Sequence, residues 1–241
     1  MSRRWLIPGF FLLLAATLSA CGGSARMAAP TELASVMPAW QVEQSLGAGW
    51  QDPFSFGPYT AQGFRQGWSD GKAWAFLGRD TDQAWQPFEY QVATSKGGEA
   101  WHCNCAARVS PEVLGAMAGP AKPDWPAKPS GSLACSLRSP QGILWRLALA
   151  SGQETGSPMR GVLQGPKLTI AVRGTNRLEG EDSPSGQTTG YVFRVDGPLM
   201  GPVGAVQVID PGLLWLPDSP DQGAMAAASA ALLLQHHQNR K

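Results

Sequence analysis

Three cysteines and one histidine are the residues whose types and spacing suggest chemistry beyond ordinary packing. Cys103 and Cys105 lie two residues apart in WHCNCAARV, beside His102, and Cys135 lies in SLACSLRS. Thiolates and an imidazole are ligands for zinc or Cu(I), so a soft-metal or redox site is one interpretation. The alternative is structural: in an oxidising compartment Cys135 forms a disulfide with either Cys103 or Cys105, which leaves one buried thiol.

Strand alternation favours the structural interpretation of these cysteines. If residues 99–109 form an extended strand, Cys103 and Cys105 share the apolar face with Trp101, whereas His102 points to the opposite face. His102 is then aimed away from the sulfurs, and two cysteines in one strand are poorly placed to bridge each other. We therefore expect a disulfide from Cys135, and neither a metal site nor a cofactor.

A catalytic constellation is not apparent in the sequence. The chain contains no G-x-S-x-G, H-E-x-x-H, P-loop or S-x-x-K motif with its companions. Besides His102 the only histidines are His236 and His237, which we expect to be solvated near the C-terminus. The acidic residues of the segment 177–190 lack the ligand spacing of a calcium loop, so this segment is predicted to be a polar, mobile loop. We name no catalytic residue and regard an enzyme as the less favoured interpretation.

Aromatic side chains are the remaining candidates for binding. The chain has ten tryptophans, and those in alternating segments, such as Trp101 and Trp145, are predicted to lie in the core. Trp40, Trp50 and Trp125 flank loops instead. We therefore regard these three as candidate surface aromatics that would stack on a glycan or contact an envelope protein.

The composition predicts many short elements in place of long helices. The 241 residues are 43% hydrophobic and 15% charged, with 29 Gly and 20 Pro. Apolar runs alternate with period 2 between turn residues, for example at 72–78, 84–94 and 143–150. We expect a mainly β fold, an antiparallel β-sandwich or barrel of about 9–11 short strands. The net charge of +1 gives no electrostatic basis for binding nucleic acid.

The C-terminal segment predicts one apolar helix over about residues 220–237. Ser219, Pro220 and Gln222 have the spacing of a capping box with proline at the first helical position. Residues 224–234 are apolar on all sides, but about 11 residues rise only ~16 Å, whereas a bilayer requires ~20 residues. A short helix that is apolar all round is buried on every side, so strands are expected to enclose it. This order of elements resembles that of tubby-like barrels, and the resemblance implies that the helix threads a closed barrel.

The N-terminus has the three parts of an export signal. Arg3 and Arg4 precede an apolar run, which ends in Leu18-Ser19-Ala20-Cys21. This end resembles the lipobox of bacterial lipoproteins. The resemblance implies cleavage before Cys21, lipid attachment to that cysteine and, with Gly22 next to it in a diderm host, location at the outer membrane.

These patterns together predict a lipid-anchored protein of the cell envelope. We expect a signal peptide at 1–20, a lipidated flexible tether at 21–39 with a short helical turn near 31–36, and a single β-rich domain at 40–241. The membrane is the expected partner, through the lipid on Cys21, along with an envelope protein or glycan. The favoured function is that of a binding or structural module; the alternatives are a carrier of a lipid or other apolar ligand, and an enzyme of unrecognised type.

Overall fold

The structure is a computed structural model that describes residues 25–44, 52–67, 85–95, 97–98, 100–121, 123–154, 156–183, 186–195 and 201–238. Cys21, Trp50 and the strand predicted at 72–78 lie outside the described residues. The described strands are β1 (Trp40–Gln44), β2 (Phe54–Phe56), β3 (Tyr59–Gln66), β4 (Trp85–Thr94), β5 (Trp101–Ala107), β6 (Ser132–Arg138), β7 (Leu144–Ala150), β8 (Arg160–Gln164), β9 (Thr169–Thr175), β10 (Arg177–Leu178), β11 (Glu181–Asp182), β12 (Gly190–Arg194), β13 (Pro202–Gln207) and β14 (Leu213–Trp215). The helices are α1 (Thr31–Ala34), α2 (Pro111–Ala118) and α3 (Gln222–Gln238), with a 3-10 turn at Gly119–Ala121.

Twelve of the strands close into one antiparallel barrel, in the order β1-β14-β13-β12-β9-β8-β7-β6-β5-β4-β3-β2. Most neighbours in the barrel are consecutive in the chain, as short hairpin connections require. β1 closes the ring, because it pairs with β2 through Val42 and Phe56 and with β14 through Trp40 and Leu214. The predicted mainly β, antiparallel fold is confirmed, and its form is a barrel. The strands number twelve instead of about nine to eleven, since the short segment next to the predicted tether also enters the sheet as β1.

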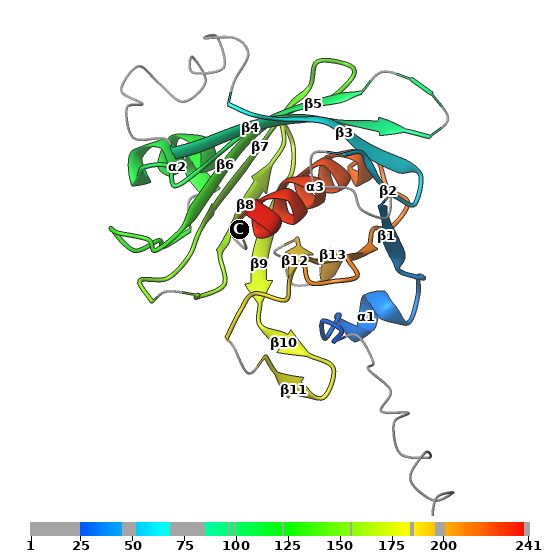
Figure 1. The fold of residues 1–241 in the computed structure, drawn as a ribbon. Coiled ribbons are helices and arrows are strands. Elements are labelled where there is room, and N and C mark those ends of the chain that lie inside the picture. The colour runs from blue at the N-terminus through cyan, green and yellow to red at the C-terminus, as the bar shows by residue number, and fades with distance from the viewer. Residues whose placement is uncertain are drawn as a thin grey trace, which may run out of the picture.

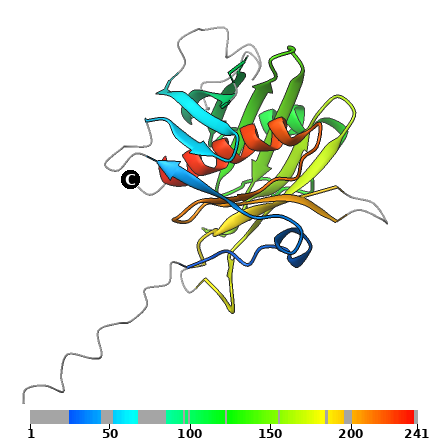
Figure 2. The same cartoon turned by 90° about the vertical axis from the view of Figure 1, so that its right-hand side faces the viewer.

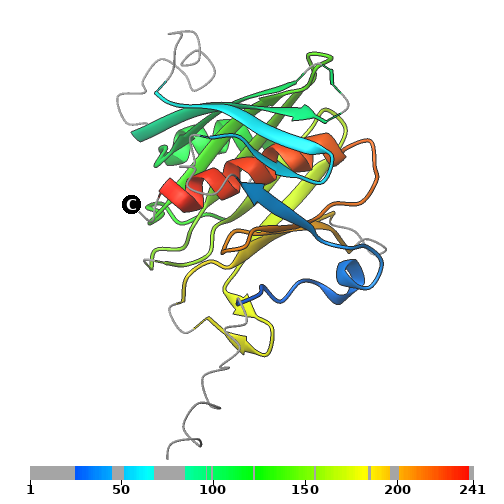
Figure 3. The ribbon, with the colours of Figure 1, turned by 45° about the vertical axis from the view of Figure 1, so that its right-hand side comes forward.

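Helix α3 runs through the inside of this barrel, with strands on all sides of it (Figures 1 and 3). Every residue from Ala224 to Gln235 is buried. The prediction of a buried apolar C-terminal helix is confirmed, and the arrangement is the one that the tubby-like resemblance implied. Alanine on most of the helix surface keeps its diameter small, so the surrounding strands can approach it closely. None of the helices among the described residues is long and apolar enough to cross a bilayer.

The predicted capping box at the start of α3 is wrong. The helix begins at Gln222, and the carbonyl of Asp221 accepts the first helical hydrogen bonds, from the amides of Ala224 and Met225. The Ser219 hydroxyl has no hydrogen-bond partner. The Gln222 amide is held elsewhere, because its Nε2 donates to the Pro217 carbonyl at 2.8 Å and its Oε1 accepts from the Tyr59 hydroxyl at 3.0 Å.

The barrel wall around β6 is buried on both of its faces. Its inward side chains, which include Cys135, pack in the cluster that contains α3, whereas the outward Ala134 packs under α2. The outer patch consists of small residues, and this allows α2 to lie directly against the strands. α2 begins with Pro111, and the hydroxyl of Ser110 accepts the Val113 amide at 3.5 Å.

The segment 25–39 packs against the barrel, so the prediction of a flexible tether through residue 39 is wrong for this part of the chain. Met27 is fully buried, and its amide donates to the Gln207 Oε1 at 2.7 Å. Its side chain lies against Gly190, where a Cβ would collide with the Met27 sulfur. Leu33 of α1 is buried in the same cluster, and Figure 2 shows α1 against the outside of the barrel. The apolar side chains of Met27 and Leu33 therefore anchor this segment to the barrel.

The expected polar loop at 177–190 also contains structure. β10 and β11 pair with each other as a two-stranded sheet outside the barrel, with Arg177 opposite Asp182. The N-terminal segment 25–39 also pairs with this sheet, because Met27 forms a bridge with Leu178 and the Glu179 amide donates to the Arg26 carbonyl at 2.9 Å. This hairpin therefore depends on the packing of the N-terminal segment.

Candidate functional site

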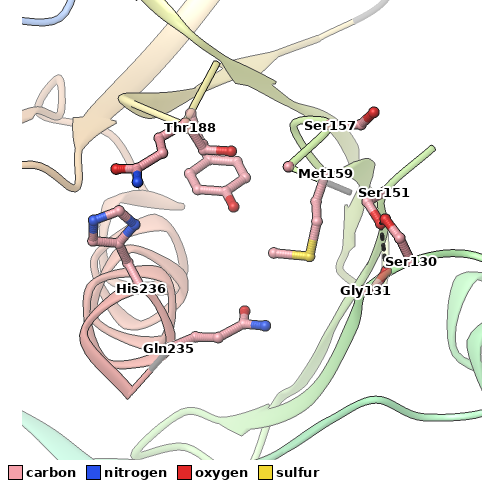
Figure 4. Close-up of a pocket in the computed structure, with 11 residues that line it drawn as sticks. Ser130, Gly131, Ser151, Ser157, Met159, Thr188, Gln235 and His236 are labelled. Atoms are coloured by element: carbon pink, nitrogen blue, oxygen red, sulfur yellow. Dashed lines mark hydrogen bonds between the residues drawn. The ribbon is translucent and has the colours of Figure 1, made fainter. Parts of the chain in front are cut away.

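A polar pocket of about 430 Å³ opens at one rim of the barrel, beside the C-terminal end of α3 (Figure 4). Five segments that end or begin at this rim build it: the start of β6, the end of β7, the approach to β8, the start of β12 and the last turn of α3. The lining residues are Ser130, Gly131, Ser151, Gly156, Ser157, Met159, Gln187, Thr188, Tyr191, Gln235 and His236. The volume lies within the usual range of small-molecule sites, about 300–1,000 Å³.

Hydrogen bonds between two connecting segments fix the serine side of the pocket. The hydroxyls of Ser130 and Ser151 lie 2.8 Å apart, as Figure 4 shows. Ser130 also approaches the Gly152 carbonyl at 2.9 Å, and Ser151 the Gly131 carbonyl at 3.1 Å. These contacts join the chain before β6 to the chain after β7, so this wall is formed by the fold itself.

Tyr191 and Gln235 are, with Ser151, the most deeply buried polar side chains of the pocket. Tyr191 is 4% exposed, and burial raises the pKa of its hydroxyl above the usual range, with a hydrogen bond to Thr188 opposing that shift in part. The phenol is therefore a neutral hydrogen-bond donor and acceptor at physiological pH. Gln235 is 5% exposed, and its Oε1 is buried with no hydrogen-bond partner. Such an unpaired buried acceptor is costly unless a donor reaches it.

The lining residues give the pocket a neutral, hydrogen-bonding character. None of those in the described part of the chain is Asp, Glu, Lys or Arg. Seven of the lining side chains carry a hydroxyl or an amide group, and Met159 supplies an apolar surface. The C-terminal end of α3 also faces this rim, and the negative end of its helix dipole disfavours anions.

A second, smaller pocket of about 310 Å³ lies next to the first and shares Ser130 and Gly131 with it. Its lining includes the exposed cations Arg108 and Lys128. The two concavities therefore differ in charge, although one short segment of chain separates them.

The structure joins Cys105 and Cys135 in a disulfide and leaves Cys103 as a buried free thiol. Cys105 and Cys135 are direct cross-strand partners in β5 and β6. Burial raises the pKa of Cys103 to about 12, and a hydrogen bond between its side chain and that of Tyr90 opposes part of this shift. The soft-metal alternative loses its ligands, since two sulfurs are bonded to each other, the third stays protonated, and His102 is exposed on the opposite face. Among the described residues no group of metal-ligating side chains is present.

The candidate aromatics are less free than the sequence implied. Trp40 is half-buried and packs on the turn at Gly57, whose φ of +54° and missing Cβ leave room for the indole. Trp125 is half-buried beside α2, and its Nε1 donates to the Arg160 carbonyl at 2.8 Å. The structure does not bring Trp40 or Trp125 to the polar pocket.

Sequence reasoning missed the residues that line this pocket. His236 was expected to be solvated, but it is half-buried and lines the pocket, because α3 ends inside the rim. The serines and threonine come from connections that carry no motif. The only sequence signal was that Gln235 and His236 directly follow a helix predicted to be enclosed by strands.

Comparison with models of protein families, with curated proteins and with solved structures found no match to this chain.

Proposed function

We propose that this protein is a lipid-anchored binding module of the cell envelope, attached through Cys21, whose ligand site is the polar pocket at the barrel rim. The observation that carries the proposal is the occupation of the barrel interior by α3, whose residues from Ala224 to Gln235 are buried. Binding must then take place on the surface, and the rim pocket offers convergent polar groups there.

The same observation argues against a carrier of apolar ligands. A carrier of this kind needs an empty apolar interior, as lipocalin-type barrels have. Here the inward side chains of the strands, such as Phe88, Leu147 and Phe193, form one cluster with the helix. Filling the interior with alanine and leucine makes the barrel a rigid scaffold, and a rigid scaffold suits a preformed site at its rim.

An enzymatic role has weaker support in the pocket. A serine nucleophile needs a base within hydrogen-bond reach of its hydroxyl. The hydroxyls of Ser130 and Ser151 are instead occupied by each other and by backbone carbonyls. These two serines therefore support the wall of a binding site and are not presented for attack.

Replacing Cys21 with Ala tests the anchor. We expect the variant to lose labelling by a palmitate analogue and to appear in the soluble fraction, because the lipid would have no attachment atom. The matched control is Cys103→Ala, which also removes one thiol but leaves Cys21 in place. Unchanged labelling of the Cys21→Ala variant would refute lipid attachment at this residue.

Filling the pocket tests the site. Ser157 lines the pocket, so Ser157→Trp should occupy it, whereas Gln153→Trp adds the same indole to the same connection at an exposed position that does not line it. We expect the wild type and Gln153→Trp to gain thermal stability from at least one compound in a panel of sugars, amino acids, nucleosides and organic acids. Ser157→Trp should gain none. Equal shifts in all three proteins would place binding elsewhere.

A further inference from the structure

The unpaired Oε1 of Gln235 is the feature of the rim pocket that most directly indicates a ligand. This side chain is more than nine-tenths buried, and Figure 4 shows that it extends from the end of α3 into the space that Met159 also faces. A buried carbonyl oxygen that no protein group reaches is satisfied when a bound molecule donates a hydrogen bond. The ligand must therefore carry a donor such as a hydroxyl or an amide N–H.

The lack of charged side chains among the described lining residues favours a neutral ligand over an ion. An anion would meet no Lys or Arg among the lining residues and would lie beside the carbonyl end of α3. A cation would be favoured at that end of the helix, but among the described residues that line the pocket there is no Asp or Glu to pair with it. Burying an ion without a partner costs far more than burying a hydroxyl that is hydrogen-bonded.

The chemical groups of the lining favour a molecule with both a polar edge and an apolar face. Hydroxyl and amide groups of Thr188, Tyr191 and Gln235 can each donate or accept, whereas Met159 presents a thioether surface. Met159 is held in place through its backbone, since its carbonyl accepts the Gly174 amide at 2.7 Å. A pyranose ring has this combination, with hydroxyls around its edge and C–H groups on its face.

A neutral peptide could also donate a hydrogen bond to the Gln235 Oε1, but the topology disfavours it. Extended peptides commonly bind by adding a strand to a free sheet edge. The twelve strands of this barrel close on themselves, so the barrel offers no such edge.

We infer that the rim pocket binds a neutral saccharide of one or two residues, with Gln235 accepting a ligand hydroxyl or amide proton and Tyr191 hydrogen-bonding the same ring. This inference rests on the proposed function and specifies its ligand class. The 430 Å³ of the pocket accommodates a ligand of this size.

The test uses the full chain in a detergent that contains no sugar, with the disaccharide of N-acetylglucosamine as probe and saturation-transfer NMR and calorimetry as readouts. We expect saturable binding that weakens about tenfold in Gln235→Leu and in Tyr191→Phe, because each change removes one hydrogen bond to the ligand. Gln164→Leu is the matched control, since Gln164 also carries a buried, unpartnered Oε1 but does not line the pocket. Its affinity should equal that of the wild type.

Three comparison probes run beside the disaccharide: a sugar phosphate, an amino sugar with a free ammonium group and a neutral dipeptide amide. If one of these binds in place of the neutral disaccharide and Ser157→Trp abolishes that binding, the saccharide inference is overturned while the binding module stands. Equal disaccharide affinity in Gln235→Leu, Gln164→Leu and the wild type would also overturn the inference. If no probe binds and Ser157→Trp behaves as the wild type in the compound panel, both the inference and the proposed site fail.

Discussion

Replacing Ala227 with Asp is expected to prevent the barrel from folding. Ala227 is fully buried inside the barrel, and its carbonyl accepts the Tyr90 hydroxyl at 2.7 Å. A carboxylate at this position would meet apolar side chains on the surrounding strands, at a cost of several kcal/mol even if it became protonated. The larger side chain would also push the strands apart and add roughly 1–3 kcal/mol. The total stability of a domain is only about 5–15 kcal/mol.

Soluble yield, far-ultraviolet circular dichroism and thermal unfolding of the full chain measure this effect. Ala230→Asp should behave in the same way, because Ala230 is also fully buried. Ala34→Asp is the matched control, an exposed alanine in the short helix α1. We expect its unfolding temperature to stay close to that of the wild type. A cooperatively folded Ala227→Asp protein would mean that strands do not enclose this helix.

Removing the disulfide is expected to cost about 3–4 kcal/mol of the free energy of unfolding. Cys105 and Cys135 are 30 residues apart in sequence, so the bond closes a long loop in the unfolded chain and lowers its entropy. The variant Cys105→Ala/Cys135→Ala should therefore unfold at a lower denaturant concentration than the wild type. Because both sulfurs are buried, part of the loss comes from two small cavities.

Cys103→Ala separates the cavity from the cross-link. This change removes one buried sulfur from the same face of β5 without opening a disulfide, so its cost should be about 1 kcal/mol. Thiol titration provides an independent check on the denatured, lipidated protein: one thiol without reductant, from Cys103, and three after reduction. Equal destabilisation of the two variants would show that the cross-link contributes nothing.

Local pattern was sufficient for most of the barrel, because most of its strands are short apolar runs bounded by turn residues, and several of them alternate with period 2. The hairpin of β6 and β7 and the enclosed helix α3 follow directly from period-2 runs and from a segment that is apolar all round. Closure was not predictable in this way. β1 lies between β2 and β14, and the pairing of Trp40 with Leu214 joins positions at opposite ends of the sequence, on which local periodicity carries no information.

Tertiary contacts determined three features that the local sequence did not predict: the start of α3, the burial of Met27 and the location of the rim pocket. Ser219, Pro220 and Gln222 have the spacing of a capping box, but the strands around α3 offer Gln222 better partners than the helix start does. Met27 lies in a stretch of small residues without a periodic apolar pattern, so nothing in the local sequence indicated that it would be fully buried. The rim pocket is assembled from five separate segments, and none of them carries a motif that would identify it from sequence alone.

The burial of Met27 against the barrel determines how long the linker between the barrel and the bilayer can be. If Cys21 carries the lipid, only five residues lie between the acylated position and Met27, whose side chain is buried against the barrel. An extended chain spans at most about 3.6 Å per residue, so this stretch reaches on the order of 20 Å, less than the thickness of a bilayer's hydrocarbon core. The barrel would then stay close to the lipid headgroups, because this short connection limits the distance between Met27 and the membrane surface.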